Sequence, residues 1–301
     1  MNKRLQKIVN NIKIYQHDIE TKGLYWSIVH RLYVFPVVRQ ILTPIINTLK
    51  PSHLNIEGNK FYIDKWDDVI SQELILSHKW EEYETELFKK NIKKGDIILD
   101  IGAHIGYYTL IAARIVGSNG RVYAFEPDPK NFSLLKKNVE ENRYKNVVLI
   151  NKAVSDTDGD LKLFLASKNT GDHRIYKPKE RRKSVKIQSI TLDNFFKNNY
   201  RVDLIKLDIQ GSEVRAIKGG QKIIKLNKNI KILTEFWPRG LKLSGSSANE
   251  YIGLLTENKF QIYDVNKDKK ATKLISAKKL LTPIESDVHD FRNIFCVKKD
   301  I

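Results

Sequence analysis

The sequence predicts an α/β fold, built as a mostly parallel sheet with helices on both faces. Short apolar segments recur from residue 97 onward, and stretches of helical character separate them. These segments are continuously apolar rather than alternating, which is typical of strands buried on both faces. A glycine-containing turn follows the first segment and leads into a helix, as in nucleotide-binding βαβ units. A chain of 301 residues can hold one large domain of this kind and an extension.

Residues 1–52 are predicted to form a helical N-terminal extension. Residues 24–50 carry a wide apolar side, and Pro36 and Pro44 must break or kink a helix there. Such a segment packs on its own domain, on a second copy in a homodimer, or on a membrane surface. Packing on protein is the commoner outcome, and contact of residues 1–50 with a membrane surface is the alternative.

Residues 53–301 form the predicted second domain, which contains the sheet. A helix at 80–90 precedes the first strand of this sheet, and further helices at 129–142 and 212–218 separate later strands. The predicted strands are 97–101, 122–125, 147–150, 204–207 and 231–235, followed by two late strands at 261–265 and 293–297.

One segment interrupts this alternation of strands and helices. The helix expected after Ala153-Val154 is missing, and residues 161–165 and 184–190 alternate between apolar and polar side chains instead. This pattern predicts an inserted β-hairpin whose loop spans residues 168–183. Long loops in α/β enzymes usually carry function or move.

The turn after the first strand reads Asp100-x-Gly102-x-x-x-Gly106, not GxGxxG. Gly102 lets the backbone turn tightly, and Gly106 keeps Cβ atoms away from a ligand over the turn. Asp100 would repel a pyrophosphate but suits an ammonium group. Glu126 lies 24 residues beyond Gly102 (126 − 102), where an acid can hold both hydroxyls of a ribose. A ligand with a ribose, an amino group and no pyrophosphate indicates S-adenosylmethionine.

The other candidate cofactor contacts follow from the positions of the strand ends. In an open parallel sheet, ligands bind outside the carboxyl ends of the strands. The turn is therefore expected at the methionine part of the cofactor, and Asp128, Lys152 and Ala153 are expected around the adenine. The predicted cofactor-binding residues at these ends are Asp100, Gly102, Ala103, His104, Gly106, Tyr107, Glu126, Pro127, Asp128, Lys152 and Ala153.

The order and spacing of six motifs make the chain similar to the FkbM family, class I methyltransferases that use S-adenosylmethionine. The resemblance starts at about residue 61 and implies a Rossmann-like seven-stranded sheet whose last strand inserts antiparallel. It also implies that Glu84 reaches the methionine end of the cofactor and that the acceptor is an oxygen of a saccharide or polar metabolite. The family often has Asn where this chain has His104. The motifs lie at 80–85, 100–109, 125–128, 153–156, 206–213 and 235–238.

A hydroxyl acceptor must lose its proton as the new bond to carbon forms, and a histidine or a carboxylate can take it. Asp208 ends the fourth core strand, where a carboxylate has little structural use. His173 lies between an acid and an arginine on the hairpin loop, although a loop histidine is often simply solvated. Asp208, His173 and Glu235 are the predicted catalytic residues, and the loop 168–183 is the predicted acceptor lid.

The sequence predicts no required metal. Asp208, Glu235 and Glu213 could offer oxygen ligands to Mg²⁺, but no HExxH motif is present. Cys296 is the only cysteine, so a thiolate zinc site and an internal disulfide are both excluded. A single cysteine fits a reducing compartment. No apolar run reaches the ~18 residues of a spanning helix, and the start lacks a signal-peptide core. These features predict a cytoplasmic protein, either free or peripheral at the inner membrane surface.

The net charge of +18, from 53 basic and 35 acidic residues, favours anionic partners. The expected partner is a small-molecule or glycan acceptor, which an acidic group would suit. However, the basic residues are spread along a chain rich in Lys, Ile and Asn, so a compositional bias explains the charge equally well.

Three other functions are weighed against oxygen methylation. An NAD-dependent oxidoreductase is disfavoured because GxGxxG is missing. A nucleic-acid methyltransferase is encouraged by the charge, but no RNA-binding module and no Asn/Asp-Pro-Pro-Tyr/Phe signature is present, so no nucleic-acid partner is expected. A membrane-surface scaffold that only binds the nucleoside would need neither Asp208 nor the segment 235–238.

Overall fold

The computed structural model describes residues 47–197, 200–266, 270–282 and 291–298. The chain divides into two compact units, Met1–Pro51 and Ser52–Ile301. The predicted helical extension at 1–52 lies almost entirely outside the described residues, so it stays a prediction. None of the helices within the described ranges is both long and apolar enough to cross a membrane.

The second unit is built on a sheet that has eight strands among the described residues, in the order β12-β11-β13-β10-β9-β3-β4-β5. The five strands from β10 to β5 pair in parallel. β13 lies antiparallel between β10 and β11, as the family resemblance implied. The strands are β3 (Ile97–Ile101), β4 (Arg121–Phe125), β5 (Val147–Ile150), β9 (Leu204–Leu207), β10 (Lys231–Phe236), β11 (Phe260–Asn266), β12 (Ala271–Leu274) and β13 (Arg292–Lys298).

The predicted seven strands are all present, and β12 is an eighth that the sequence did not indicate. It pairs antiparallel with β11 at the edge of the sheet. Its four residues, Ala-Thr-Lys-Leu, are partly or fully exposed. A strand that buries no face leaves no apolar pattern in the sequence, which explains why it was missed.

Each face of the sheet is covered by its own group of helices, and alternate strand residues point to the two faces. Leu99, Ile205 and Ile232 pack under α7 to α12, whereas Ile98, Leu204 and Leu233 pack under α3 to α6. The helices are α3 (Ile70–Ser77), α4 (Glu82–Lys90), α5 (Tyr107–Val116), α6 (Pro129–Glu141), α7 (Leu192–Phe196), α8 (Glu213–Gly219), α9 (Gln221–Leu226), α10 (Pro238–Leu243), α11 (Ala248–Glu257) and α12 (Ala277–Leu280).

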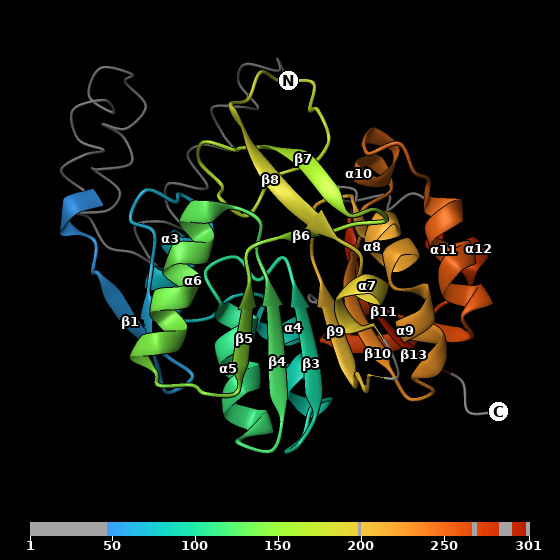
Figure 1. Cartoon of the computed structure of the whole chain (residues 1–301), viewed down its shortest axis with the longest axis horizontal. Coiled ribbons are helices and arrows are strands. Elements are labelled where there is room, and N and C mark those ends of the chain that lie inside the picture. Colours follow the sequence, from blue (N-terminus) through green and yellow to red (C-terminus); the bar gives the residue numbers. More distant parts are fainter. Residues whose placement is uncertain (1–46, 198–199, 267–269, 283–290, 299–301) are drawn as a thin grey trace, which may run out of the picture. The chain divides into compact units, whose positions relative to one another are not determined.

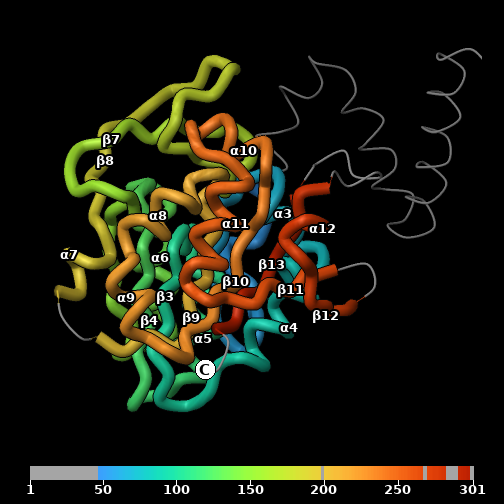
Figure 2. The backbone as a smooth tube through the Cα atoms, turned by 90° about the vertical axis from the view of Figure 1, so that its right-hand side faces the viewer, coloured from blue at the N-terminus to red at the C-terminus, as the bar shows by residue number. Residues whose placement is uncertain are grey.

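The inserted β-hairpin is present as predicted. β7 (Gly159–Phe164) and β8 (Ser184–Ile190) pair antiparallel, and β6 (Ala153–Val154) adds to β8 in parallel. The arrowheads of β3, β4 and β5 point towards this small sheet, which therefore lies beyond the carboxyl ends of the core strands (Figure 1). In the view turned by 90°, β7 and β8 again lie towards the top, as they do in Figure 1 (Figure 2).

A second hairpin, β1 (His53–Ile56) and β2 (Asn59–Tyr62), contacts α6. The backbone N–H of Tyr62 donates to the side-chain oxygen of Asn138 on α6 at 2.7 Å. The amide nitrogen of Asn138 donates in turn to the carbonyl of Ile105, in the turn after β3, at 2.8 Å. One buried side chain thus fixes the hairpin, α6 and the turn relative to one another.

Candidate functional site

The turn between β3 and α5 requires glycine at two places. Gly102 has φ +84°, and a Cβ there would lie 2.0 Å from the carbonyl oxygen of Asp208 on the neighbouring strand end. Gly106 precedes the first residue of α5 with φ +99°. Both conformations are in the left-handed region that favours glycine. The turn can therefore lie flat against the end of β9, which brings the ends of β3 and β9 together.

Glu126 follows β4 and lies beside this turn. Its two carboxylate oxygens accept the backbone N–H groups of His104 and Asp128, each at 2.8 Å. Burial raises the pKa of Glu126 to about 8, although both backbone hydrogen bonds act in the opposite direction. A carboxylate has about four acceptor positions, so two remain for hydroxyl groups of a ligand.

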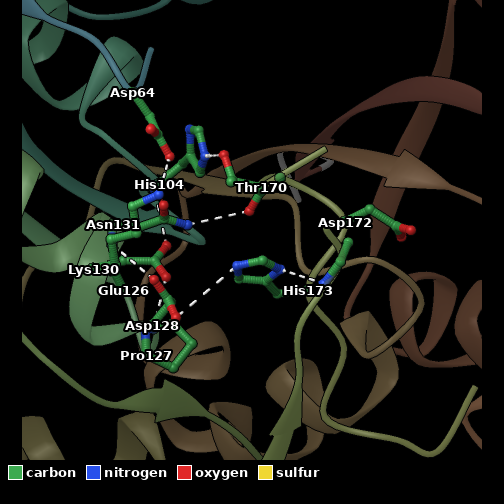
Figure 3. Close-up of polar contacts among 12 residues, drawn as sticks. Asp64, His104, Glu126, Pro127, Asp128, Lys130, Asn131, Thr170, Asp172 and His173 are labelled. Carbon is green, nitrogen blue, oxygen red and sulfur yellow. Dashed lines mark hydrogen bonds and ion pairs between the residues drawn. The ribbon is translucent and has the colours of Figure 1, made fainter. Parts of the chain in front are cut away.

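His104 ties the cofactor turn to the hairpin loop. Its Nε2 lies 2.7 Å from the hydroxyl of Thr170, which itself donates to Asp67 at 2.5 Å. Since that hydroxyl proton is already used, Nε2 of His104 must carry the hydrogen of the first contact. Burial lowers the pKa of His104 to about 4, so the ring is neutral at pH 7. Asn131 adds a 3.2 Å bond to the Thr170 carbonyl, as the close-up shows (Figure 3).

His173 points at Asp128 from the opposite side of the site (Figure 3). Its Nε2 lies 4.0 Å from an Asp128 carboxylate oxygen, and its Nδ1 accepts the Ala166 N–H at 3.0 Å. Asp128 also caps α6 by accepting the Asn131 N–H. Burial lowers the pKa of His173. The contacts of His173 thus belong to the loop and to the expected adenine side.

A pocket opens where these segments meet. Its wall includes eight of the residues predicted from the sequence. They are Gly102, His104, Glu126, Pro127, Lys152, Ala153, His173 and Asp208. The hairpin loop contributes Thr170 and Gly171, and β7 contributes Leu163. Glu84, Asp100, Ala103, Gly106, Tyr107, Asp128 and Glu235 are not part of this wall. Tyr107 instead packs its ring against Phe61, and its hydroxyl accepts the Trp80 N–H at 3.2 Å.

A second polar group lies on the α4 and α5 side of the sheet, at the ends of β3, β9 and β10. We call it the acidic layer. Lys206 is the cation of this cluster, and its amino group lies 3.6 Å from a carboxylate oxygen of Asp208. The acidic layer comprises Glu81, Glu84, Asp100, Asp208 and Glu235 around Lys206.

The carboxyl groups of the acidic layer differ in their partners. Asp100 accepts the Thr109 hydroxyl at 2.5 Å, and burial raises its pKa to about 6. Glu84 accepts the Asn293 amide at 3.2 Å. Burial raises the pKa of Glu235 well above its ordinary value, and Oε2 of that side chain has no hydrogen-bond partner among the described residues. Asp208 is partly open, with a side chain that is 32% exposed and accepts the Gln210 amide at 2.9 Å.

Sequence reasoning missed four residues that shape the site. Lys206 interrupts an otherwise apolar strand, and that interruption was a usable signal. Glu81 lies in a motif that the resemblance identified, next to the predicted Glu84. Thr170 and Asp67 become neighbours only through the fold, so no local pattern could have linked them.

The pocket fits the nucleoside part of S-adenosylmethionine. Gly102 brings the cofactor turn against the end of β9, and both Gly102 and Asp208 line the pocket. Glu126 presents free acceptor positions where a ribose is expected, and Lys152 and Ala153 border the same pocket. Within the described residues, no group of three or more His, Cys, Asp or Glu side chains is arranged to hold a metal ion. The expectation of no required metal stays a prediction.

Comparisons with known proteins find similarity to methyltransferases. The chain is 24% identical over 136 residues to the hexuronic acid methyltransferase AglP of Haloferax volcanii, a match covering 44% of this chain and 53% of that protein. It is 33% identical over 60 residues to a protein-L-isoaspartate O-methyltransferase of Methanothrix thermoacetophila, covering 20% of this chain and 29% of that protein. A solved FkbM methyltransferase of Methylobacillus flagellatus is 14% identical, with a TM-score of 0.41, over 87% of this chain and 59% of that one.

The chain thus spans at most about half the length of these curated relatives. The model of the methyltransferase FkbM domain family matches residues 100–262, from the cofactor turn to β11. This match takes in more than half of the chain, and it includes Glu126, Asp208 and Glu235. The methyl donor is S-adenosylmethionine. The chain belongs to the FkbM family of methyltransferases.

Proposed function

We propose that this methyltransferase acts on a hydroxyl group of a saccharide that carries an acidic group, such as a hexuronate. The position of Asp208 carries the proposal. Its carboxylate stands at the carboxyl end of β9, and Asp208 is the one acid of the acidic layer that lines the pocket together with the cofactor turn. A base in that place can take the proton of a hydroxyl whose oxygen faces the cofactor.

Two further observations support a saccharide with an acidic group. A relative that matches 44% of this chain is named a hexuronic acid methyltransferase. The hairpin loop beside the pocket also presents the exposed cations Lys177, Lys179, Arg181 and Lys183. Arg174 and Arg182 do not belong to this set, because both pair with Asp172 at 2.7 Å.

The division of chemical work follows from these positions. S-adenosylmethionine supplies a methyl group that is already activated on a sulfonium. The protein must then align the acceptor oxygen, exclude water and accept a proton. Asp208 accepts the proton. The hairpin loop is the proposed barrier to water. It is attached near the strand ends, because Tyr176 donates to the Gln210 carbonyl at 3.1 Å and the Arg174 guanidinium lies 5.0 Å from the Trp237 ring.

A transfer assay with labelled S-adenosylmethionine tests the proposal. The probes are oligosaccharides that end in glucuronate, the same oligosaccharides with the carboxyl reduced to an alcohol, and a catechol as a non-sugar hydroxyl. We expect methyl transfer to the glucuronate series, lower transfer to the reduced series, and an ether-linked product by mass spectrometry. Transfer to the catechol alone, or a methyl ester as the product, would contradict the proposed acceptor.

The two sides of the hairpin loop are expected to respond differently to mutation. Arg174→Ala removes the contact with Trp237, and a cation–π contact is worth roughly 0.5–2 kcal/mol. It should raise the acceptor KM about 2- to 30-fold and leave the affinity for S-adenosylmethionine unchanged. His173→Ala removes a contact to Asp128 and should weaken cofactor binding instead.

Titration calorimetry with S-adenosylmethionine and steady-state kinetics with the glucuronate probe measure the two effects separately. Lys162→Ala, an exposed position on β7, is the matched control and should change neither quantity. If Arg174→Ala weakened only cofactor binding, the loop would close the nucleoside pocket and would not be an acceptor lid.

A further inference from the structure

Lys206 is a buried cation that the proposed chemistry does not yet use. It lies in β9 between buried apolar residues, and only 3% of its side chain is exposed. Its Cα is paired in register with Asp100 on β3 and with Leu233 on β10. These pairings place Lys206 on the same face of the sheet as Asp100. A buried ammonium group is costly unless it is paired, so its neighbours show why it is tolerated.

The neighbours of Lys206 are acids that come from four separate elements. Its Nζ is 3.6 Å from Asp208 and 4.8 Å from the centre of the Tyr108 ring. Burial by itself would lower the pKa of Lys206, but the surrounding carboxyl groups outweigh burial and raise that pKa above its ordinary value. These carboxyl groups belong to Asp208, Glu81, Asp100 and Glu235. Lys206 therefore stays charged inside the sheet.

Asp208 lies close to four other carboxyl groups of the site. They are Glu81 from the segment before α4, Asp100 from β3, Glu213 from α8 and Glu235 from β10. Lys206 is the opposing charge on its own strand. The two oxygens of Asp208 are held by different partners, because Gln210 donates to Oδ1 at 2.9 Å and Lys206 lies 3.6 Å from Oδ2. This arrangement holds the carboxylate in one orientation.

We propose that Lys206 is a positioning residue, which keeps Asp208 ionised and orients its carboxylate towards the acceptor hydroxyl. The proposal rests on the proposed function, because Asp208 is the base there. Without Lys206, Asp208 would face these four carboxyl groups and would lose the cation that lies 3.6 Å from its Oδ2. It would then hold its proton over a wider pH range and could not accept one from the substrate.

The experiment is a carbon-13 NMR titration of protein labelled at aspartate carboxyl carbons. The Asp208 resonance is identified by its loss in Asp208→Asn. An opposite charge at this distance shifts the titration of a carboxyl by about 1–3 pH units, so the Asp208 midpoint should rise by about that amount in Lys206→Met. Lys206→Arg, which keeps the charge, should restore most of the shift. Lys298→Met is the matched control, because Lys298 is a partly buried lysine of β13 that donates to the Ile224 carbonyl.

Binding of S-adenosylhomocysteine and thermal melting establish that each variant is folded, and Lys206→Gln replaces Lys206→Met if the latter is not. In the unmutated protein, the nitrogen-15 resonance of Lys206 should move with the same midpoint as Asp208. An unmoved Asp208 midpoint in the neutral variant, or a Lys206 resonance that ignores Asp208, would overturn the proposal. These measurements use no acceptor, so they can fail while methyl transfer to the saccharide succeeds, and the reverse also holds.

Discussion

Glu126→Ala is expected to remove most of the affinity for S-adenosylmethionine. The carboxylate has two acceptor positions left after it binds the N–H groups of His104 and Asp128. Hydrogen bonds from two ribose hydroxyls to a charged acceptor are worth roughly 1.5–3 kcal/mol each. Their loss should raise the dissociation constant by a factor on the order of 100 or more. Titration calorimetry measures this directly, and an affinity close to that of the unmutated protein would contradict the role of Glu126.

The same residue predicts a dependence of binding on pH. Because the pKa of Glu126 is raised to about 8, the side chain is mostly protonated at pH 7 in the free protein. Accepting two hydroxyl hydrogen bonds favours the ionised form, so binding at pH 7 should release up to one proton per site. Affinity should therefore increase as pH rises from 6 to 8. Proton release follows from the binding enthalpy in buffers of different ionisation enthalpy, and Glu126→Ala should abolish it.

Folding stability is expected to show the opposite trend. An acid whose pKa is higher in the folded chain than in the unfolded chain favours folding most at low pH. The contribution of Glu126 is full below about pH 4.5, its ordinary pKa, and is lost as pH rises through about 8. Glu126→Ala should remove this part of the pH dependence of the melting temperature. It also leaves two backbone N–H groups without an acceptor, so the melting temperature should fall at all pH values.

The parallel core of the fold was predictable because burial on two faces leaves a local signature. β3, β4, β5, β9 and β10 are short apolar runs, and each lies within one residue of its predicted bounds. The glycine turn was equally visible, since only glycine fits at Gly102 against Asp208. β12 was missed because it is an exposed strand at the edge of the described sheet, where it pairs with β11.

The candidate site was most directly predictable where a single residue follows the end of a strand. Glu126 and Asp208 are of this kind, and both line the pocket. The network of His104, Thr170 and Asp67 joins residues up to 103 positions apart, so no pattern of spacing could reveal it. His173 could be named from its loop, but its orientation towards Asp128 depends on how that loop folds back over α6. Side-chain direction in such a loop is a tertiary property.

Asp208→Asn is the variant expected to slow the chemical step most. The substitution keeps the shape of the side chain, and its oxygen can still accept the Gln210 amide. It removes the charge that takes the acceptor proton, and loss of a general base typically costs a factor of about 10²–10⁴ in turnover. Cofactor affinity should change only a few-fold, because Glu126 and the turn are untouched.

Single-turnover kinetics with the glucuronate probe should therefore show a slow methyl-transfer step in Asp208→Asn, with a normal melting curve. Asp156→Asn is the matched control, since Asp156 is an exposed aspartate just beyond β6. Lys206 keeps Asp100, Glu81 and Glu235 as neighbours in this variant, so the buried cation remains paired and the fold should persist. Turnover close to that of the unmutated enzyme would move the base to another residue. Glu235 would then be the first to test, because its Oε2 is buried and unpartnered among the described residues.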